Sequence, residues 1–286
     1  MTGYCTKNKL LLGGSLSVGA ALFLAILTHP FKPQDTLSRI QNLGTLRVGY
    51  AITPPHTFLT PDGHPTGESV QLAHQAATAL GFKQIEWILT GYGSLTDELI
   101  ARRFDLVACG TFPNTDGYPE ITNSIPTFNT QSTLLVQTNN PLQLHSTLDL
   151  LQHPTVRIAV ISQSIQEAQL LTNGFPEDRL ISAPNTVAAH AMVQLSAADA
   201  LLLPQTSARW ILQHHPNNTT QPASPFSDTL TQPTTPIRGG FLFLKSDAPL
   251  LQAWNHALTQ TLISQEYQQL AREFGLLPNE STDGTP

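Results

Sequence analysis

Hydrophobic and polar positions alternate in a regular way over most of the chain, and the clearest unit covers residues 91–110. Leu95 and Leu99 have the spacing of one apolar helix face, and Ser94 precedes them as a natural N-cap. Residues 106–109 form a short, wholly apolar run, which is typical of a parallel strand covered on both faces. The pattern predicts a loop, a short helix and a buried strand that ends at a glycine.

The same alternation recurs along the chain and predicts an α/β fold made of two β-α-β modules. Strands are predicted at 45–52, 84–89, 106–109, 132–137, 156–161, 180–182, 200–203 and 239–244, and helices at 69–80, 95–103, 148–152, 164–173, 186–195, 205–213 and within 248–274. This order predicts parallel sheets with right-handed crossovers. We expect two lobes joined by two crossings, near 132–137 and 239–244, because a double connection permits hinge closure.

The chain of 286 residues is long enough for two lobes that each bury a core. We assign 1–30 to a signal peptide or N-terminal membrane anchor, 31–43 to a linker, 44–136 and 239–276 to lobe 1, 137–238 to lobe 2, and 277–286 to a disordered tail.

The first residues have the pattern of an export segment. Lys7 and Lys9 precede an uncharged apolar run over residues 10–27. This run is at the lower limit for crossing a bilayer and is long for the core of a signal peptide. No small-x-small cleavage site follows it, which favours an uncleaved anchor over a cleaved signal. Either outcome places the folded part in the periplasm, free or anchored to the inner membrane.

Composition excludes several functions. A net charge of −6 argues against a nucleic-acid surface. The ten histidines are scattered without metal-ligand spacing, so we expect no metal site and no cofactor. Neither a G-x-S-x-G motif nor an acid–base pair is present, so we expect no catalytic residues and no enzyme activity. We expect a monomer.

Several stretches resemble a known family. They are GTLRVGY (44–50), TGE (66–68), GYGSL (91–95), ARRFDLVACG (101–110) and GGFLFLKSD (239–247). Together they resemble the family 3 extracellular solute-binding proteins of amino-acid-type ABC transporters. EWILTGYGSL and GFPEDRL are similar to the ectoine- and hydroxyectoine-binding branch. The likeness covers about residues 44–276. It implies a two-lobed type II periplasmic-binding fold that captures a small zwitterion between its lobes for an ABC permease in the inner membrane.

Three positions depart from the pattern that the resemblance implies. Gly117 stands where the family has an arginine for the ligand carboxylate, and Pro204 stands where many members have an acid for the ligand ammonium. Thr53 occupies the position of an acid in the ectoine-like branch. A buried ligand carboxylate without a charged partner loses about 1.5–3 kcal/mol of interaction. The scaffold is therefore expected and the identity of the ligand stays open.

Candidate ligand contacts follow the strands, because ligands of open α/β sheets bind at the carboxyl ends of the strands. Aromatic candidates are Tyr92, Phe112 and Phe58, and His56 stands where the ectoine-like branch tends to have a phenylalanine. Polar candidates are Thr111, Asn114, Gln163, Ser164 and Gln205. Each has a structural alternative: core packing for the phenylalanines, and a plain N-cap for Ser164.

Two other functions stay open at this point. The first is a membrane-tethered sensor or accessory protein of the same fold, with altered or lost ligand specificity. The second is an enzyme, because cyclohexadienyl dehydratases are similar to this fold and use acids in the cleft. The chain offers few such acids beyond Asp116, which disfavours the enzyme.

Overall fold

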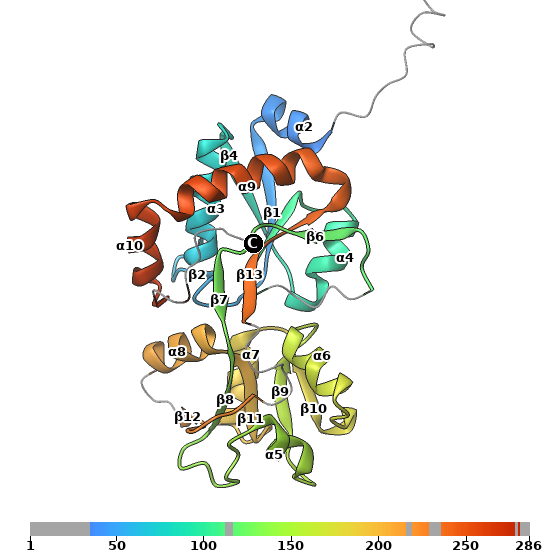
Figure 1. Cartoon of the computed structure of the whole chain (residues 1–286), viewed down its shortest axis with the longest axis vertical. Helices are drawn as coiled ribbons and strands as arrows, with labels where there is room; N and C mark the ends of the chain where they lie inside the picture. Colours follow the sequence, from blue (N-terminus) through green and yellow to red (C-terminus); the bar gives the residue numbers. More distant parts are fainter. Residues whose placement is uncertain (1–34, 112–116, 216–218, 229–235, 278–279, 281–286) are drawn as a thin grey trace, which may run out of the picture. The chain divides into compact units, whose positions relative to one another are not determined.

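The computed structural model describes residues 35–111, 117–215, 219–228, 236–277 and 280, and its described part is built on two sheets (Figure 1). The predicted export segment over residues 10–27 lies outside these ranges. Within them, no helix has the length and apolar character needed to span a bilayer.

The first sheet has the strand order β4-β1-β5-β13-β6, and β7 also pairs with β13. β1 is parallel to β4 and β5, whereas β13 is antiparallel to β5, β6 and β7. The bounds are Thr45–Tyr50 (β1), Gln84–Leu89 (β4), Leu106–Thr111 (β5), Ile121–Asn123 (β6), Phe128–Thr130 (β7) and Ile237–Leu244 (β13).

The second sheet has the order β10-β9-β11-β8-β12. β9 is parallel to β10 and β11, and β8 is antiparallel to β11 and β12. The bounds are Ser132–Gln137 (β8), Ile158–Ile161 (β9), Leu180–Ala183 (β10), Ala200–Pro204 (β11) and Thr220–Pro222 (β12). A small hairpin pairs β2 (Phe58–Leu59) with β3 (Pro65–Thr66).

Helices cover both sheets. Those packed with the first sheet are α2 (Thr36–Leu43), α3 (Glu68–Ala79), α4 (Leu95–Ile100), α9 (Ala248–Leu262) and α10 (Gln265–Glu273). Those packed with the second are α5 (Thr147–Gln152), α6 (Ile165–Thr172), α7 (Thr186–Gln194) and α8 (Gln205–His214). Short 3₁₀ turns are η1 (Tyr92–Ser94), η2 (Glu177–Arg179) and η3 (Lys245–Asp247).

Both faces of each sheet are buried because successive strand residues point to opposite sides. In β5, Leu106 and Ala108 join a core with α3 and α9, whereas Val107 joins the core under α4. In β11, Leu202 packs with α5 and α6, and Leu201 packs with α7 and α8. The continuous apolar runs of the sequence are thus explained by sheets that have helices on each side.

The parallel pairing predicted for the β-α-β modules is confirmed, because β1 is parallel to β4 and β5 and β9 is parallel to β10 and β11. The antiparallel strands β8 and β13 lie in the two stretches predicted as crossings. The structure corrects one part of the predicted topology. We expected residues 132–137 to be a crossing at the end of lobe 1, but β8 pairs along its length with β11 and β12 of the second sheet. The chain changes sheet between Thr130 and Ser132. The other lobe boundaries stay a prediction.

The two ends of the described chain are more ordered than predicted. Most of the linker assigned to residues 31–43 is helix α2, whose Ile40 is fully buried. In the tail assigned to residues 277–286, the backbone N–H of Leu277 donates to the Glu280 carboxylate, and Glu280 is 4% exposed. The remaining tail residues lie outside the described ranges.

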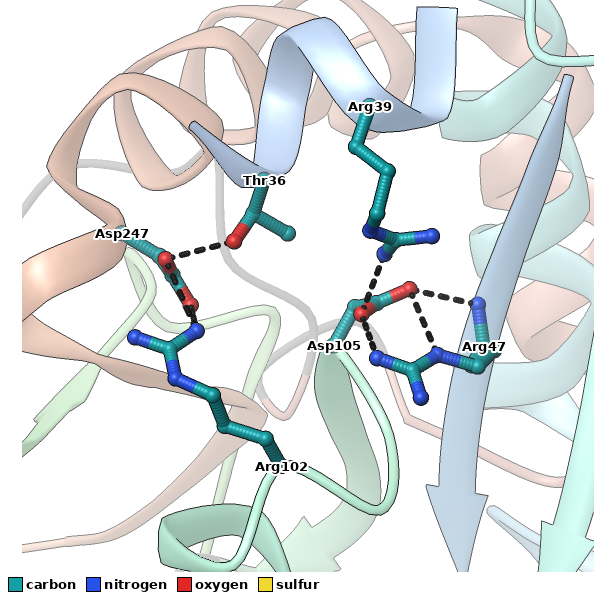
Figure 2. A network of polar contacts seen from close by, with 6 residues as sticks. All are labelled: Thr36, Arg39, Arg47, Arg102, Asp105 and Asp247. Atoms are coloured by element: carbon teal, nitrogen blue, oxygen red, sulfur yellow. Dashed lines mark hydrogen bonds and ion pairs between the residues drawn. The ribbon is translucent and has the colours of Figure 1, made fainter. Parts of the chain in front are cut away.

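A buried aspartate fixes α2 to the first sheet, as Figure 2 shows. Asp105 is 3% exposed and lies directly before β5. Its carboxylate accepts the Arg47 backbone N–H at 2.9 Å and pairs with the guanidinium groups of Arg47 at 2.7 Å and Arg39 at 2.5 Å. The hydrogen bond to Asp105 raises the pKa of Arg47 above its ordinary value.

Asp247 is a second aspartate that holds α2 in place (Figure 2). It accepts the hydroxyl of Thr36, the first residue of α2, at 2.7 Å, and it pairs with Arg102 at 3.2 Å. Asp105 and Asp247 therefore tie three segments to α2: β1, the turn after α4, and the start of α9.

Replacing Asp105 by alanine is expected to lower the free energy of unfolding by about 2–3 kcal/mol, because two guanidinium groups and one backbone N–H lose their acceptor. Urea unfolding of the full chain in mild detergent, followed by tryptophan fluorescence, measures the change. Asp178→Ala, at an exposed position in η2, is the control and should stay within about 0.5 kcal/mol of the wild type. Equal losses in both variants would contradict a stabilising role for the Asp105 cluster.

Candidate functional site

A small cavity lies where the carboxyl ends of parallel strands from both sheets meet. From the first sheet it is lined by Thr53, His56 and Tyr92, which follow β1 and β4. From the second sheet it is lined by Ile161, Ser164, Gln166, Thr186, Pro204 and Ser207, which end or follow β9, β10 and β11. The space open to the centre of a water molecule is about 10 Å³, enough for about one water.

A larger hollow of about 910 Å³ lies along α10. Its lining runs from Ile263 to Leu276, and none of these residues follows a parallel strand. It is also open to solvent on one side of a single amphipathic helix. The position at the strand ends, rather than the size, therefore identifies the small cavity as the candidate site.

His56 is the most constrained side chain of the cavity. It is 1% exposed and stacks on Phe128 with ring centroids 3.9 Å apart and planes inclined by 13°. Its Nδ1 lies 2.9 Å from Glu68 Oε2, and its Nε2 lies 3.4 Å from Thr206 Oγ1. The contact with Glu68 joins His56 to α3, which packs on the first sheet. The contact with Thr206 joins it to α8, which packs on the second sheet.

Glu68 explains why His56 takes this position. It is fully buried at the start of α3, and its carboxylate also accepts the hydroxyls of Tyr267 at 2.8 Å and Ser69 at 2.9 Å. At Gly67, φ is +121°, and a Cβ there would lie 2.3 Å from the carbonyl oxygen of His56. The Thr-Gly-Glu motif therefore supplies a glycine for the close backbone approach and a carboxylate that fixes the imidazole.

The Tyr267 hydroxyl shares the same buried carboxylate. Burial, and then the charge of Glu68 and the hydrogen bond to it, raise the pKa of Tyr267 well above its ordinary value. This places a neutral phenol donor and an anionic acceptor together behind His56.

Three helices of the second sheet begin at the cavity. Ser164 caps α6 by accepting the Glu167 N–H at 3.2 Å, and Asn185 caps α7 by accepting the Ala188 N–H at 2.9 Å. α8 begins directly after Pro204 and has no side-chain cap. The N-terminal N–H groups of a helix carry a partial positive charge, so the second-sheet wall suits negative or neutral acceptors.

One face of α8 also contacts the first-sheet side at three positions with i, i+3 and i+4 spacing. Thr206 meets His56, and Trp210 lies 5.1 Å from Phe58 between ring centroids. Arg209 forks onto Glu280 at 2.8 and 2.9 Å and donates to the carbonyl of Gly275 at 2.8 Å. A bidentate pair of this kind is directional as well as attractive.

The structure brings three of the predicted site residues together: His56, Tyr92 and Ser164. Gln163 and Gln205 are exposed and do not line the cavity, although they neighbour residues that do. Phe58 packs between Trp210 and Phe274 instead of facing the cavity.

The remaining predicted site residues are Thr111, Phe112 and Asn114. Thr111 is the last residue of β5 and pairs with Gly239, while Phe112 and Asn114 lie outside the described residues. Of the three positions that depart from the family pattern, Thr53 and Pro204 line the cavity and Gly117 is exposed. Asp116 also lies outside the described residues.

Sequence reasoning missed Gln166, Thr186, Ser207 and Glu68. The rule that selects strand carboxyl ends also points to Thr186 and Ser207, since they follow β10 and β11. The residues around Glu68 in the sequence do not indicate its role, because its partner Tyr267 is 199 residues away. Within the described ranges, no three His, Cys, Asp or Glu side chains gather as metal ligands.

A family model for the bacterial extracellular solute-binding proteins, family 3, matches residues 46–276. The chain belongs to this family. A probable amino-acid ABC transporter periplasmic-binding protein of Sinorhizobium fredii is 28% identical over 269 residues, which cover 93% of this chain and 88% of that protein.

Solved structures agree with the fold. EhuB in complex with hydroxyectoine has a TM-score of 0.76 at 23% identity and covers 85% of this chain and 92% of its own. An ancestral amino acid-binding protein, a precursor of cyclohexadienyl dehydratase, has a TM-score of 0.72 at 25% identity, covering 84% and 99%. The resemblance and the type II periplasmic-binding fold are confirmed.

The family assigns the general role. Family 3 proteins bind small molecules outside the cytoplasm for ABC transport, so this chain is a solute-binding protein and not an enzyme.

Replacing Tyr267 by phenylalanine is expected to lower the free energy of unfolding at pH 7 by about 1.5–3 kcal/mol, because Glu68 loses a charged hydrogen bond. In the wild type, the folded-state pKa of Tyr267 is raised above the ordinary 10.0, so its contribution is complete below pH 10 and is lost as the pH rises further. The wild-type advantage should therefore shrink between pH 10 and pH 11.5.

Urea unfolding at several pH values measures this difference. Tyr50→Phe is the matched control, because burial alone raises the pKa of Tyr50. Tyr50→Phe should lower the free energy of unfolding at pH 7 by less than Tyr267→Phe does. A Tyr267→Phe deficit that stays constant from pH 7 to pH 11.5 would rule out the buried Tyr267–Glu68 pair as its source.

Proposed function

We propose that this protein is the extracytoplasmic receptor of an amino-acid-type ABC importer and that it captures a small polar or zwitterionic solute, an amino acid or an ectoine-like compound. The observation that carries the proposal is the position of the cavity. Its walls come from the carboxyl ends of parallel strands in both sheets, so one bound solute would contact both sides at once. The partner would be a permease in the inner membrane.

The size of the cavity requires movement during binding. A space of about 10 Å³ accepts one water, whereas an amino acid has several heavy atoms. The His56–Thr206 contact joins the two sides beside this space, and at 3.4 Å it is long for a hydrogen bond. A solute would therefore enter after the two sides separate, and its polar groups would take the place of this weak contact.

The neighbours support the class of solute. One solved structure with this fold holds hydroxyectoine, and another, a substrate-binding protein of an ABC uptake transporter from Streptococcus pneumoniae, holds histidine. Both solutes are small and polar. Tyr92, buried at the cavity wall, would offer an aromatic face to such a compound.

A thermal-shift screen of the full chain in mild detergent against amino acids, ectoines, betaines and small peptides tests the proposal. A solute at 100 times its Kd stabilises the folded state by about 2.7 kcal/mol, which raises Tm by about 5–10 °C for a protein of this size. No shift with any compound of the screen would argue against the receptor function.

The site of binding is tested with a blocked variant. Ser207→Trp fills the cavity and should abolish the shift, while Ala197→Trp, at an exposed position, should leave it unchanged. A shift that survives in Ser207→Trp would place the binding site elsewhere.

A further inference from the structure

The charged groups of the cavity are unusually few. Of the nine side chains that line it in the described part of the chain, none is aspartate, glutamate, lysine or arginine. His56 is the one basic side chain among these nine. Recognition of an ionic solute in this cavity therefore depends on the imidazole and on backbone dipoles.

Three helices begin at the cavity, and α8 is the one of them whose N-terminus no side chain caps. It has 10 residues and begins directly after Pro204. The backbone N–H of Gln205 donates to the carbonyl of Gln131, and Ser207 of the first turn lines the cavity. The positive end of the helix is thus directed at the same small space as His56.

An independent observation indicates that a polar group belongs there. Thr186 is fully buried and lines the cavity, and its Oγ1 has no hydrogen-bond partner among the described residues. A buried hydroxyl without a partner is rare in proteins. Because the whole space is about 10 Å³, the groups that surround it converge on one position of atomic size.

We propose that this position receives the carboxylate of the solute, held between His56 Nε2 and the N-terminus of α8, with the Thr186 hydroxyl as a further donor. This proposal rests on the proposed receptor function, and it names the groups that would hold the carboxylate of the solute. Glu68 holds Nδ1 of the ring, so the remaining nitrogen, Nε2, which lies 3.4 Å from Thr206 Oγ1, is the one that a solute could engage. The bound imidazole donates from both nitrogens, to Glu68 on one side and to the solute on the other.

The arrangement also explains the long contact between His56 and α8. Nε2 and Thr206 Oγ1 are 3.4 Å apart, beyond the usual distance for a strong bond. A carboxylate oxygen between the two sides would accept from the imidazole, a hydroxyl and backbone N–H groups at ordinary distances of about 2.7–3.0 Å. The site thus replaces a guanidinium fork by an imidazolium and a helix terminus.

The test compares acids with their amides. Wild-type protein is titrated by calorimetry, at one pH and salt concentration, with carboxylic acids that shift its Tm and with the corresponding primary amides. The acids are expected to bind at least about 10-fold more tightly than the amides, since a hydrogen bond to a charged group is stronger than one to a neutral group. Equal affinities for acids and amides would overturn the proposal while leaving the receptor function in place.

Thr186→Val tests the site itself. Valine keeps the shape and removes a hydroxyl that has no protein partner, so unfolding stability should be equal to or above that of the wild type, while affinity for the acids falls about 10-fold. Thr220→Val is the matched control: its hydroxyl bonds His190 Nε2 at 2.9 Å outside the cavity, so stability should fall and affinity should not.

His56→Gln tests the charge. Glutamine keeps an N–H donor for Glu68 but carries no charge, so the preference for acids over amides should shrink to less than about 3-fold. An unchanged acid affinity in Thr186→Val shows that the position holds only water, and an unchanged preference in His56→Gln shows that the charge lies elsewhere. Either result overturns the proposal. Failure of the wild type to bind any compound of the screen instead contradicts the receptor function.

Discussion

The buried carboxylate of Glu68 determines the geometry on which the candidate site depends. A fully buried carboxylate is costly unless its oxygens are hydrogen-bonded, and here three donors satisfy it. Those donors come from the loop after β1, from α3 itself and from α10, so one group joins the loop and α3 to a helix 199 residues away in sequence. His56 is held by this group, and its Nε2 lies 3.4 Å from Thr206 Oγ1 of α8.

The ion pairs of Asp105 and the cavity lie at opposite ends of the strands of the first sheet. Asp105 precedes β5 and pairs with Arg39 and Arg47 near the amino ends of the strands (Figure 2). The cavity lies beyond the carboxyl ends of the same strands, and its described lining is formed by hydroxyl, amide, aromatic and apolar groups with one imidazole. Ion pairs thus serve to fix α2, while the cavity keeps a low density of fixed charge in which a single ionic group of a solute has a large effect.

The sequence predicted those parts of the fold whose signals are local. The strands β4 and β8 have the predicted bounds, because each is a compact run with clear breaks on both sides. β6, β7 and β12 were not predicted, since three-residue strands are defined by their partners and not by their own pattern. The assignment of β8 to the wrong lobe has the same cause: antiparallel pairing with β11 is a contact over more than 60 residues, which periodicity does not encode.

The same distinction separates the predicted from the missed site residues. Tyr92 and Ser164 lie close after β4 and β9 and were predicted from that position, whereas His56 was predicted from the resemblance to the ectoine-like branch. Glu68 carries a residue type that is almost never buried unless paired, and its pairing becomes visible only when α10 is folded onto α3. Phe58 was assigned to the ligand because aromatic residues suit both ligands and cores, and the structure packs it against Trp210 of α8.

α8 links the chemistry of the cavity to the contact between the two sides. Its N-terminus lies at the cavity, and three and four residues after Thr206 the side chains of Arg209 and Trp210 contact Glu280 and Phe58 of the first-sheet side. A helix moves as a rigid body over this length, so a shift that opens the cavity at Thr206 also stretches the Arg209–Glu280 pair. Because that pair is bidentate and Glu280 is buried, separation costs more than breaking an exposed ion pair. In the proposed binding mode, interactions that a solute makes at the start of α8 would therefore add to contacts that already favour closure, and the affinity for the solute would depend on both.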